Sequence, residues 1–253
     1  MQGKASIRLL VIGYGLFVMG YVLTIAGCRP MHVVDSHTEA LRVDSTSDSL
    51  QDTAYMQYSK PVRTFIAQEM SIQIGYLADT LWVAKPECPM LNWASDALLA
   101  QARKKSGRHV DMAVVNIGGM RDDWHPGALT LGHIYELMPF DNWLVLLTMK
   151  GQDILDLCEG FARRGGEGVA GLRMTAVGGH LAECLIDGKA VEPERQYIVA
   201  TSNYLAGGAD KMFELQRYSE RLDSDLLIRD LYIQAIQESD TIHAVMDGRV
   251  QLL

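Results

Sequence analysis

The stretch Asp111-Met112-Ala113-Val114-Val115-Asn116-Ile117-Gly118-Gly119-Met120-Arg121 decides the fold, because a short apolar run stops there at polar side chains and glycines. Its two valines favour a buried strand. Gly118 and Gly119 allow positive φ and let backbone amides approach a bound group. Asn116 and Arg121 flank them and carry donors and acceptors suited to sugar hydroxyls, phosphates or carboxylates. The pattern indicates a strand that ends at a ligand, although Asn-x-Gly-Gly is also ordinary turn chemistry.

The N-terminal segment has the form of an export signal. Lys4 and Arg8 precede a long, almost uncharged run, which could also be a retained transmembrane anchor. The ending Ile25-Ala26-Gly27-Cys28 is similar to a bacterial lipobox and favours processing with lipidation of Cys28. We therefore expect residues 1–27 to be a lipoprotein signal peptide. The body is then lipid-anchored in the bacterial cell envelope and faces the periplasm or the cell exterior.

The composition describes an acidic chain that can bury a core, since 48% of its residues are hydrophobic. Residues 1–27 contain two basic and no acidic residues, so their removal moves the formal net charge from −8 to −10. Such a body repels nucleic-acid backbones, and no nucleic-acid partner is expected. A small anion must then be bound by local donors such as Arg121.

Three cysteines remain if Cys28 carries lipid, namely Cys88, Cys158 and Cys184. At most one disulfide bond can form among them, and their spacing does not resemble a metal-binding knuckle. We interpret all three as small buried residues.

Hydropathy divides the remainder into a tether and one folded body. Residues 28–60 are polar and rich in Ser, Asp and Thr, which is typical of a flexible tether, and the core is expected from Pro61. Strands are expected near 71–83, 111–116, 127–130, 143–149, 172–177, 180–186 and 197–201. Helices are expected from about 90 to 105, around 134–137, from Gly151 to about 161 and over 223–238, with a glycine-rich loop at 165–171. This irregular order predicts an α+β fold, a single domain over 61–253 with mixed β-sheets flanked by helices.

Three groups of ligand-type residues are placed at strand ends, at Asn116–Arg121, Phe140–Asn142 and Tyr204–Asp210. Rings brought from two separate loops, Phe140 and Tyr204, can sandwich a flat heterocycle. Asp210 can then accept hydrogen bonds from ribose hydroxyls. The alternatives are that both rings are core aromatics and that Arg121 merely pairs with a neighbouring surface aspartate.

The segments 116–121, 139–142 and 203–210 resemble, in order and character, the signature segments of the C-terminal domain of 5′-nucleotidases. The resemblance covers about residues 62–250 and includes the segments 87–92 and 247–249. It implies that Asn116 and Arg121 hold the ribose and phosphate side of a nucleotide. By position it also implies that Phe140 and Tyr204 stack on the base, Asn142 reads the base edge and Asp210 binds the ribose.

Three positions depart from the family pattern. Tyr204 replaces the phenylalanine of well-studied members, which keeps the ring but adds a hydroxyl that needs a partner. Ala209 stands in a run usually occupied by glycine. Pro89 stands where some members have an additional arginine, which implies weaker phosphate binding here.

Complete 5′-nucleotidases also carry a metallophosphatase domain whose two metal ions activate water, and residues 1–60 are too short to contain one. The fragment Asp123-Trp124-His125 resembles the start of such a metal site, but no run completes it, and we interpret it as a solvated loop. We therefore expect no catalytic or metal-binding residue in this chain. The divalent metals are expected on a separate metallophosphatase chain, this chain being the nucleotide-recognising part of a split 5′-nucleotidase. The alternatives are a lipoprotein that binds nucleosides or nucleotides without hydrolysis, and a structural descendant that has lost the ligand.

Overall fold

The computed structural model describes Tyr14 and residues 17–19, 33–40 and 52–253. The chain divides into two units, Met1–Met56 and Gln57–Leu253. The signal peptide expected over 1–27 lies almost wholly outside the described residues, and so does Cys28. No helix in the described part of the chain combines the length and apolar composition that crossing a bilayer requires.

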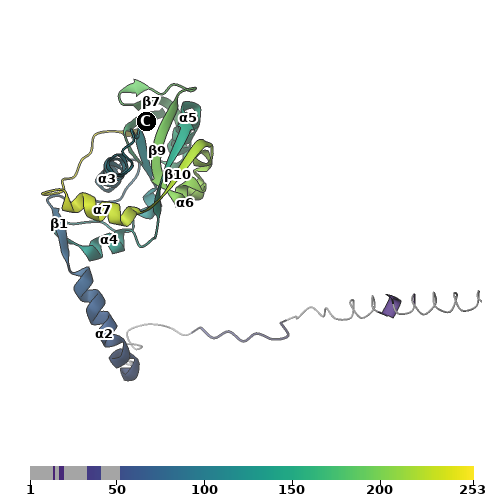
Figure 1. The fold of residues 1–253 in the computed structure, drawn as a ribbon, viewed down its shortest axis with the longest axis vertical. Coiled ribbons are helices and arrows are strands. Elements are labelled where there is room, and N and C mark those ends of the chain that lie inside the picture. Colours follow the sequence, from purple (N-terminus) through teal and green to yellow (C-terminus); the bar gives the residue numbers. More distant parts are fainter. Residues whose placement is uncertain (1–13, 15–16, 20–32, 41–51) are drawn as a thin grey trace, which may run out of the picture. The chain divides into compact units, whose positions relative to one another are not determined.

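A five-stranded mixed sheet forms the centre of the second unit, in the order β10 (Tyr218–Leu227), β4 (Trp143–Lys150), β9 (Gln196–Ser202), β2 (Met112–Val115) and β5 (Gly168–Ala170). Only β9 and β2 pair in parallel; every other neighbouring pair of this sheet is antiparallel. Helix α3 (Pro89–Ser106) and helix α7 (Ile228–Gln237) lie on one side of this sheet, and helix α5 (Gly151–Arg164) lies on the other (Figure 1).

Side-chain alternation along the strands sends residues into two cores, one on each face of the sheet. In β2, Ala113 and Val115 pack into the core under α3 and α7, while Met112 and Val114 pack into the core under α5. Successive residues of a strand point to opposite faces, so a strand buried on both faces reads as a continuous apolar run. The strand expected at 111–116 is therefore present and fully buried.

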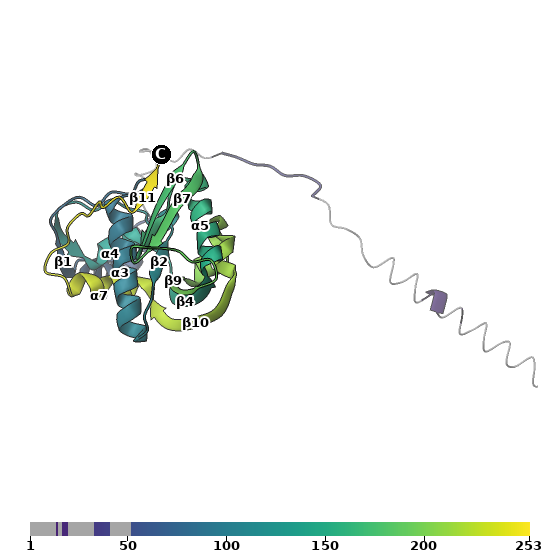
Figure 2. The ribbon, with the colours of Figure 1, turned by 90° about the horizontal axis from the view of Figure 1, so that it is seen from above.

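Two smaller sheets flank the central one. Strand β1 (Gln73–Leu77) pairs antiparallel with β3 (Gly127–Thr130), beside the short helix α4 (Leu131–Leu137). The other sheet has the order β11 (Val250–Leu252), β6 (Leu172–Val177), β7 (His180–Ile186) and β8 (Lys189–Ala190). Figure 2 shows β6 and β7 next to α5, the helix that contributes to the same core. The mixed α and β architecture predicted from the sequence is confirmed.

Helix ends follow the sequence signals closely. Cys88 caps α3 by accepting a hydrogen bond from Leu91 N, and Gly107 ends the helix at φ 62°, a conformation that favours glycine. Thr130 begins α4 in a capping box with His133, as expected for that residue. Pro89 occupies the first turn of α3, where its missing N–H has no intrahelical partner to lose.

Helix α2 (Thr53–Met70) was not expected, because residues up to Lys60 were assigned to the tether. Asp52 caps it by accepting hydrogen bonds from Ala54 N and Tyr55 N. The helix contains Pro61 and buries none of its residues, so the core begins after it, in β1. Residues 33–40 form neither helix nor strand.

Two further expectations about secondary structure were wrong. The helix expected over 223–238 begins only at Ile228, and residues 218–227 form the edge strand β10. The glycine-rich loop at 165–171 contains the short strand β5, whose residues Gly168–Ala170 pair with β2. Both strands lie at the edges of the central sheet, where pairing on one side suffices to define them.

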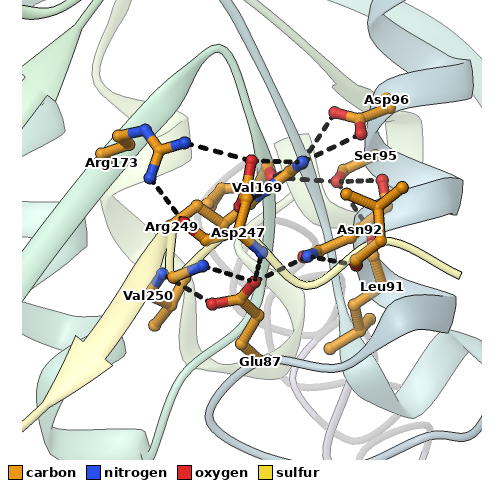
Figure 3. Close-up of polar contacts among 12 residues, drawn as sticks. Glu87, Leu91, Asn92, Ser95, Asp96, Val169, Arg173, Asp247, Arg249 and Val250 are labelled. Atoms are coloured by element: carbon orange, nitrogen blue, oxygen red, sulfur yellow. Dashed lines mark hydrogen bonds and ion pairs between the residues drawn. The ribbon is translucent and has the colours of Figure 1, made fainter.

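A buried polar network ties the C-terminal segment to the start of α3 (Figure 3). The Glu87 carboxylate accepts hydrogen bonds from the Asn92 side chain and from backbone N–H groups of Asp247, Gly248 and Val250. Arg249, itself 7% exposed, forms an ion pair with Asp96 at 2.7 Å. These contacts fix the chain end against the helix that covers the central sheet.

Candidate functional site

A pocket of about 230 Å³ lies where strands β2 and β9 end and strand β4 begins. Its lining consists of the eight residues predicted from the sequence, Asn116, Gly118, Gly119, Arg121, Phe140, Asn142, Tyr204 and Asp210. They come from three segments, of which 116–121 follows β2 and 203–210 follows β9. The segment 140–142 precedes β4 and does not follow a strand as expected. Because β4 runs antiparallel to β9, the beginning of β4 lies beside the C-terminal ends of β9 and β2.

Asn116 is 8% exposed and lines this pocket where β2 passes into a 3₁₀ turn over Ile117–Gly119. Its side-chain amide donates a hydrogen bond to the Asp210 carboxylate. A Cβ atom on Gly119 would lie 2.9 Å from Asn116 Oδ1, closer than such atoms normally approach. The glycine therefore leaves room for the amide that holds the first and third segments together.

Arg121 and Phe140 form one unit of the pocket. The guanidinium carbon of Arg121 lies 5.2 Å from the centre of the Phe140 ring, within the range of a cation–π contact. The ring is 38% exposed, so it is not a core aromatic. The Arg121 guanidinium, with its five donors, thus lies beside the accessible Phe140 ring. This arrangement suits a ligand in which an anionic group is joined to a flat heterocycle.

The hydroxyl of Tyr204 has a partner, because it donates a hydrogen bond of 2.9 Å to Asp210 Oδ1. That bond and the charge of the carboxylate raise the pKa of the Tyr204 phenol. The Tyr204 ring is 48% exposed. Asp210 sits at φ 52° and follows Gly208 at φ 82°, so this loop keeps left-handed turns although Ala209 replaces a glycine.

The N-terminal turn of α7 forms hydrogen bonds with the loop that carries Phe140 and Asn142. Arg229 donates to the Asp141 carboxylate at 2.7 Å, and its guanidinium lies over the Tyr135 ring, 4.3 Å from the ring centre. Ile228 N donates to the carbonyl oxygen of Asn142 at 2.9 Å. These bonds fix the backbone of the loop and therefore the position of the Phe140 ring.

Glu167, a buried acidic residue that contacts the glycine turn of the pocket, was not predicted from the sequence. Its carboxylate accepts a hydrogen bond of 2.9 Å from Ile117 N, at the start of the glycine turn, and its Oε1 lies 4.0 Å from Lys85 Nζ. Burial raises the pKa of this carboxyl, while the bond from Ile117 N lowers it. A lone charged residue in the run Gly165-Gly166-Glu167-Gly168 was the signal available in the sequence.

The Asp123-Trp124-His125 fragment forms a structural contact. Trp124 is fully buried and bridges to Leu81, and Asp123 accepts a hydrogen bond from Val83 N at 2.8 Å. His125 is exposed. Over residues 14, 17–19, 33–40 and 52–253, no three His, Cys, Asp or Glu side chains gather closely enough to hold a metal ion.

Comparison with known proteins places this chain in a family. Residues 73–217 match the family described as "5'-nucleotidase, C-terminal domain", which is more than half of the chain. The chain belongs to this family. All eight pocket residues fall within the matched stretch.

Curated members of the family are similar at low identity. The 5'-nucleotidase of Vibrio cholerae is 25% identical over 182 residues, which are 70% of this chain and 33% of that protein. Protein UshA of Yersinia enterocolitica is 23% identical over 210 residues, 80% of this chain and 38% of that protein. The chain thus spans little more than a third of the length of these 5'-nucleotidase-family relatives.

Solved structures share the fold. The 5'-nucleotidase precursor of Thermus thermophilus superposes with a TM-score of 0.70 at 24% identity, over 81% of this chain and 43% of that chain. The NAD nucleotidase of Haemophilus influenzae gives a TM-score of 0.62 at 20% identity, over 83% of this chain and 41% of that chain. At these identities the likeness concerns the fold of the 5'-nucleotidase C-terminal domain alone.

Proposed function

We propose that this chain is the nucleotide-recognising domain of a split 5'-nucleotidase that acts in nucleotide catabolism. The pocket holds the base, ribose and phosphate side of the substrate. A separate metallophosphatase chain supplies the divalent metal ions and transfers the phosphoryl group to water. The observation that carries the proposal is the convergence of two accessible rings and an arginine, Phe140, Tyr204 and Arg121, on one pocket.

In this proposal each group has a role that matches its chemistry. The base stacks between Phe140 and Tyr204, a type of contact that contributes about 1–3 kcal/mol per base in single-strand binders. Asn142 contacts the base edge. Asn116 and Asp210 hold the ribose hydroxyls, and the Arg121 guanidinium pairs with the phosphate.

The proposal divides binding and hydrolysis between two chains. A curated relative such as the 5'-nucleotidase of Vibrio cholerae is about three times as long as the stretch it shares with this chain. Assigning hydrolysis to a partner chain is part of the proposal, and the hydrolysis assay below tests it. In the same proposal, Cys28 carries the lipid that tethers the domain in the bacterial cell envelope, at the end of a segment outside the described residues.

Calorimetry with adenosine and AMP tests the binding part of the proposal on residues 29–253. Both ligands should bind, and Phe140→Ala should weaken both. Hydrolysis of AMP is then assayed with divalent metal, with and without an exported metallophosphatase of the same organism. Activity is expected only with both chains present, and hydrolysis by this chain alone would contradict the split.

A second candidate function is capture of nucleosides or nucleotides without hydrolysis. It is favoured by the composition of the pocket, because all the aromatic and polar groups that would bind the ligand come from this chain. Ligand binding that no metallophosphatase converts into activity would support this function. Unchanged affinity in both Phe140→Ala and Tyr204→Ala would indicate that the pocket has lost its ligand.

A further inference from the structure

Two buried thiols face each other where α5 packs against β7, and neither of them lines the pocket. Cys158 lies on α5 and Cys184 on β7, and their Sγ atoms are 3.6 Å apart. Cys158 is fully buried and Cys184 is 6% exposed. Cys88 is also buried but caps α3 in the opposite core. The three cysteines therefore divide into a pair and a single residue.

The geometry of the pair lies close to that of a covalent bond. A disulfide bond has an S–S length of about 2.0 Å, so each sulfur has to move by less than about 1 Å from its present place. The side chain next to Cys158 already holds the two elements in register, because Glu159 accepts a hydrogen bond of 2.6 Å from Leu181 N. Glu159 Oε1 also lies 3.0 Å from His180 Nδ1. Helix and hairpin are thus fixed against each other beside the thiols.

We propose that Cys158 and Cys184 form a disulfide bond when the chain folds in an oxidising compartment. The proposal rests on the export of the chain that is part of the proposed function, since disulfides persist in compartments such as the bacterial periplasm. The bond joins α5 to the β6–β7 hairpin on the face of the central sheet that α5 covers. Cys88 keeps its free thiol.

The bond forms by exchange with a disulfide donor, either a small molecule or an oxidant protein of the envelope. One cysteine thiolate attacks a donor sulfur and gives a mixed disulfide, while the other donor sulfur leaves as a thiolate. The second cysteine then attacks the first cysteine sulfur and releases the remaining donor sulfur. Two electrons pass from the cysteine pair to the donor, and the two thiol protons pass to the donor thiolates or to water.

Exchange is expected before α5 closes over the hairpin. The hydrogen bond with Cys184, together with burial, raises the pKa of the Cys158 thiol well above its ordinary value in the folded protein. A folded, reduced protein should therefore react slowly with the donor. Before the two elements pack together, both thiols are accessible to the donor.

The test refolds the reduced, denatured chain in a mixture of glutathione and glutathione disulfide. Iodoacetamide is then added under denaturing conditions without reductant, and peptides are mapped by mass spectrometry. A peptide joining Cys158 to Cys184, two hydrogens lighter than the reduced pair, is expected together with alkylated Cys88. Alkylation of both Cys158 and Cys184, or a bridge to Cys88, would overturn the proposal.

Two variants serve as matched controls. Cys88→Ser should leave the linked peptide unchanged, and Cys158→Ser should abolish it. The wild-type peptide map decides the question even where Cys158→Ser does not fold. Because refolding takes place outside the cell, the pairing is tested independently of export. AMP calorimetry on the same refolded sample tests the pocket separately.

Discussion

The guanidinium of Arg121 lies over the ring of Phe140, with 5.2 Å between the guanidinium carbon and the ring centre. The two residues come from different segments, one after β2 and the other before β4. Their contact places a permanent positive charge beside an accessible aromatic surface. In the proposed site, the Arg121 guanidinium therefore binds the phosphate next to the base that stacks on Phe140.

Arg121→Ala should therefore separate phosphate recognition from base recognition. A hydrogen bond to a charged group contributes about 1.5–3 kcal/mol, so AMP affinity should fall by about 10- to 150-fold. Adenosine lacks the phosphate, and its affinity should change by only about three-fold, or less than 1 kcal/mol. Calorimetry with both ligands measures the two effects. An equal loss for adenosine and AMP would show that Arg121 does not act through the phosphate.

Tyr204→Phe should distinguish the ring from the hydroxyl. The substitution keeps the aromatic face and removes the 2.9 Å hydrogen bond to Asp210. The carboxylate is then free to accept from ribose hydroxyls, so adenosine affinity should be kept or increased. Tyr204→Ala also removes the ring and should cost about 1–3 kcal/mol of binding free energy. If Tyr204→Phe weakened adenosine as much as Tyr204→Ala, the hydroxyl and not the ring would be the binding group.

The pocket could be predicted from the sequence because each of its segments adjoins an apolar strand. Strands such as β2 and β4 are buried on both faces and are recognisable as continuous apolar runs. Aromatic and amide residues next to such runs stand out. The direction of β4 could not be predicted from the sequence. Because β4 runs antiparallel to β9, the residues that precede it lie beside the residues that follow β2 and β9.

The missed elements have weak signals for physical reasons. Strand β10 carries exposed polar residues such as Glu220 and Asp223 and is an edge strand, so little burial marks it in the sequence. Helix α2 contains Pro61, a residue type that usually ends a helix, and none of its side chains is buried. The role of Glu167 depends on a backbone N–H fifty residues away, which no local pattern indicates.

Stability in acid should depend on Glu159, which links α5 to β7. Hydrogen bonds from Leu181 N, Arg163 and His180, in decreasing order of their effect, lower its pKa from 4.5 to about 2. A carboxyl with a lowered folded pKa stabilises the fold fully above its unfolded pKa and loses that contribution as pH falls towards the folded pKa. Between pH 4.5 and 2, the free energy of unfolding should therefore fall more steeply in the wild type than in Glu159→Gln.

Urea unfolding at several pH values measures this slope. Glu183→Gln is the matched control, because Glu183 lies exposed on the same strand as the Glu159 partners and keeps the link between α5 and β7. Its slope should equal that of the wild type. Equal slopes in all three proteins would mean that the Glu159 contacts do not persist in solution.

Arg249 should be the most sensitive position of the network that holds the chain end (Figure 3). Its guanidinium is almost fully buried and contacts Asp96, Asp247 and the carbonyl oxygen of Val169. Removing one member of a buried ion pair typically costs about 3–5 kcal/mol. Because Asp96 is half-exposed and can regain water, Arg249→Ala should cost about 3 kcal/mol of unfolding free energy, the lower end of that range.

Arg173→Ala is the control for this loss, since Arg173 is 53% exposed and pairs with the same Asp247 at 3.2 Å. An exposed pair contributes at most about 1 kcal/mol, so the free energy of unfolding in urea should change little. Arg249→Lys keeps the charge but lacks the planar guanidinium that reaches two carboxylates at once. Its free energy of unfolding should therefore be close to that of Arg249→Ala. Similar losses of unfolding free energy in Arg173→Ala and Arg249→Ala would show that burial does not determine how much each arginine stabilises the fold.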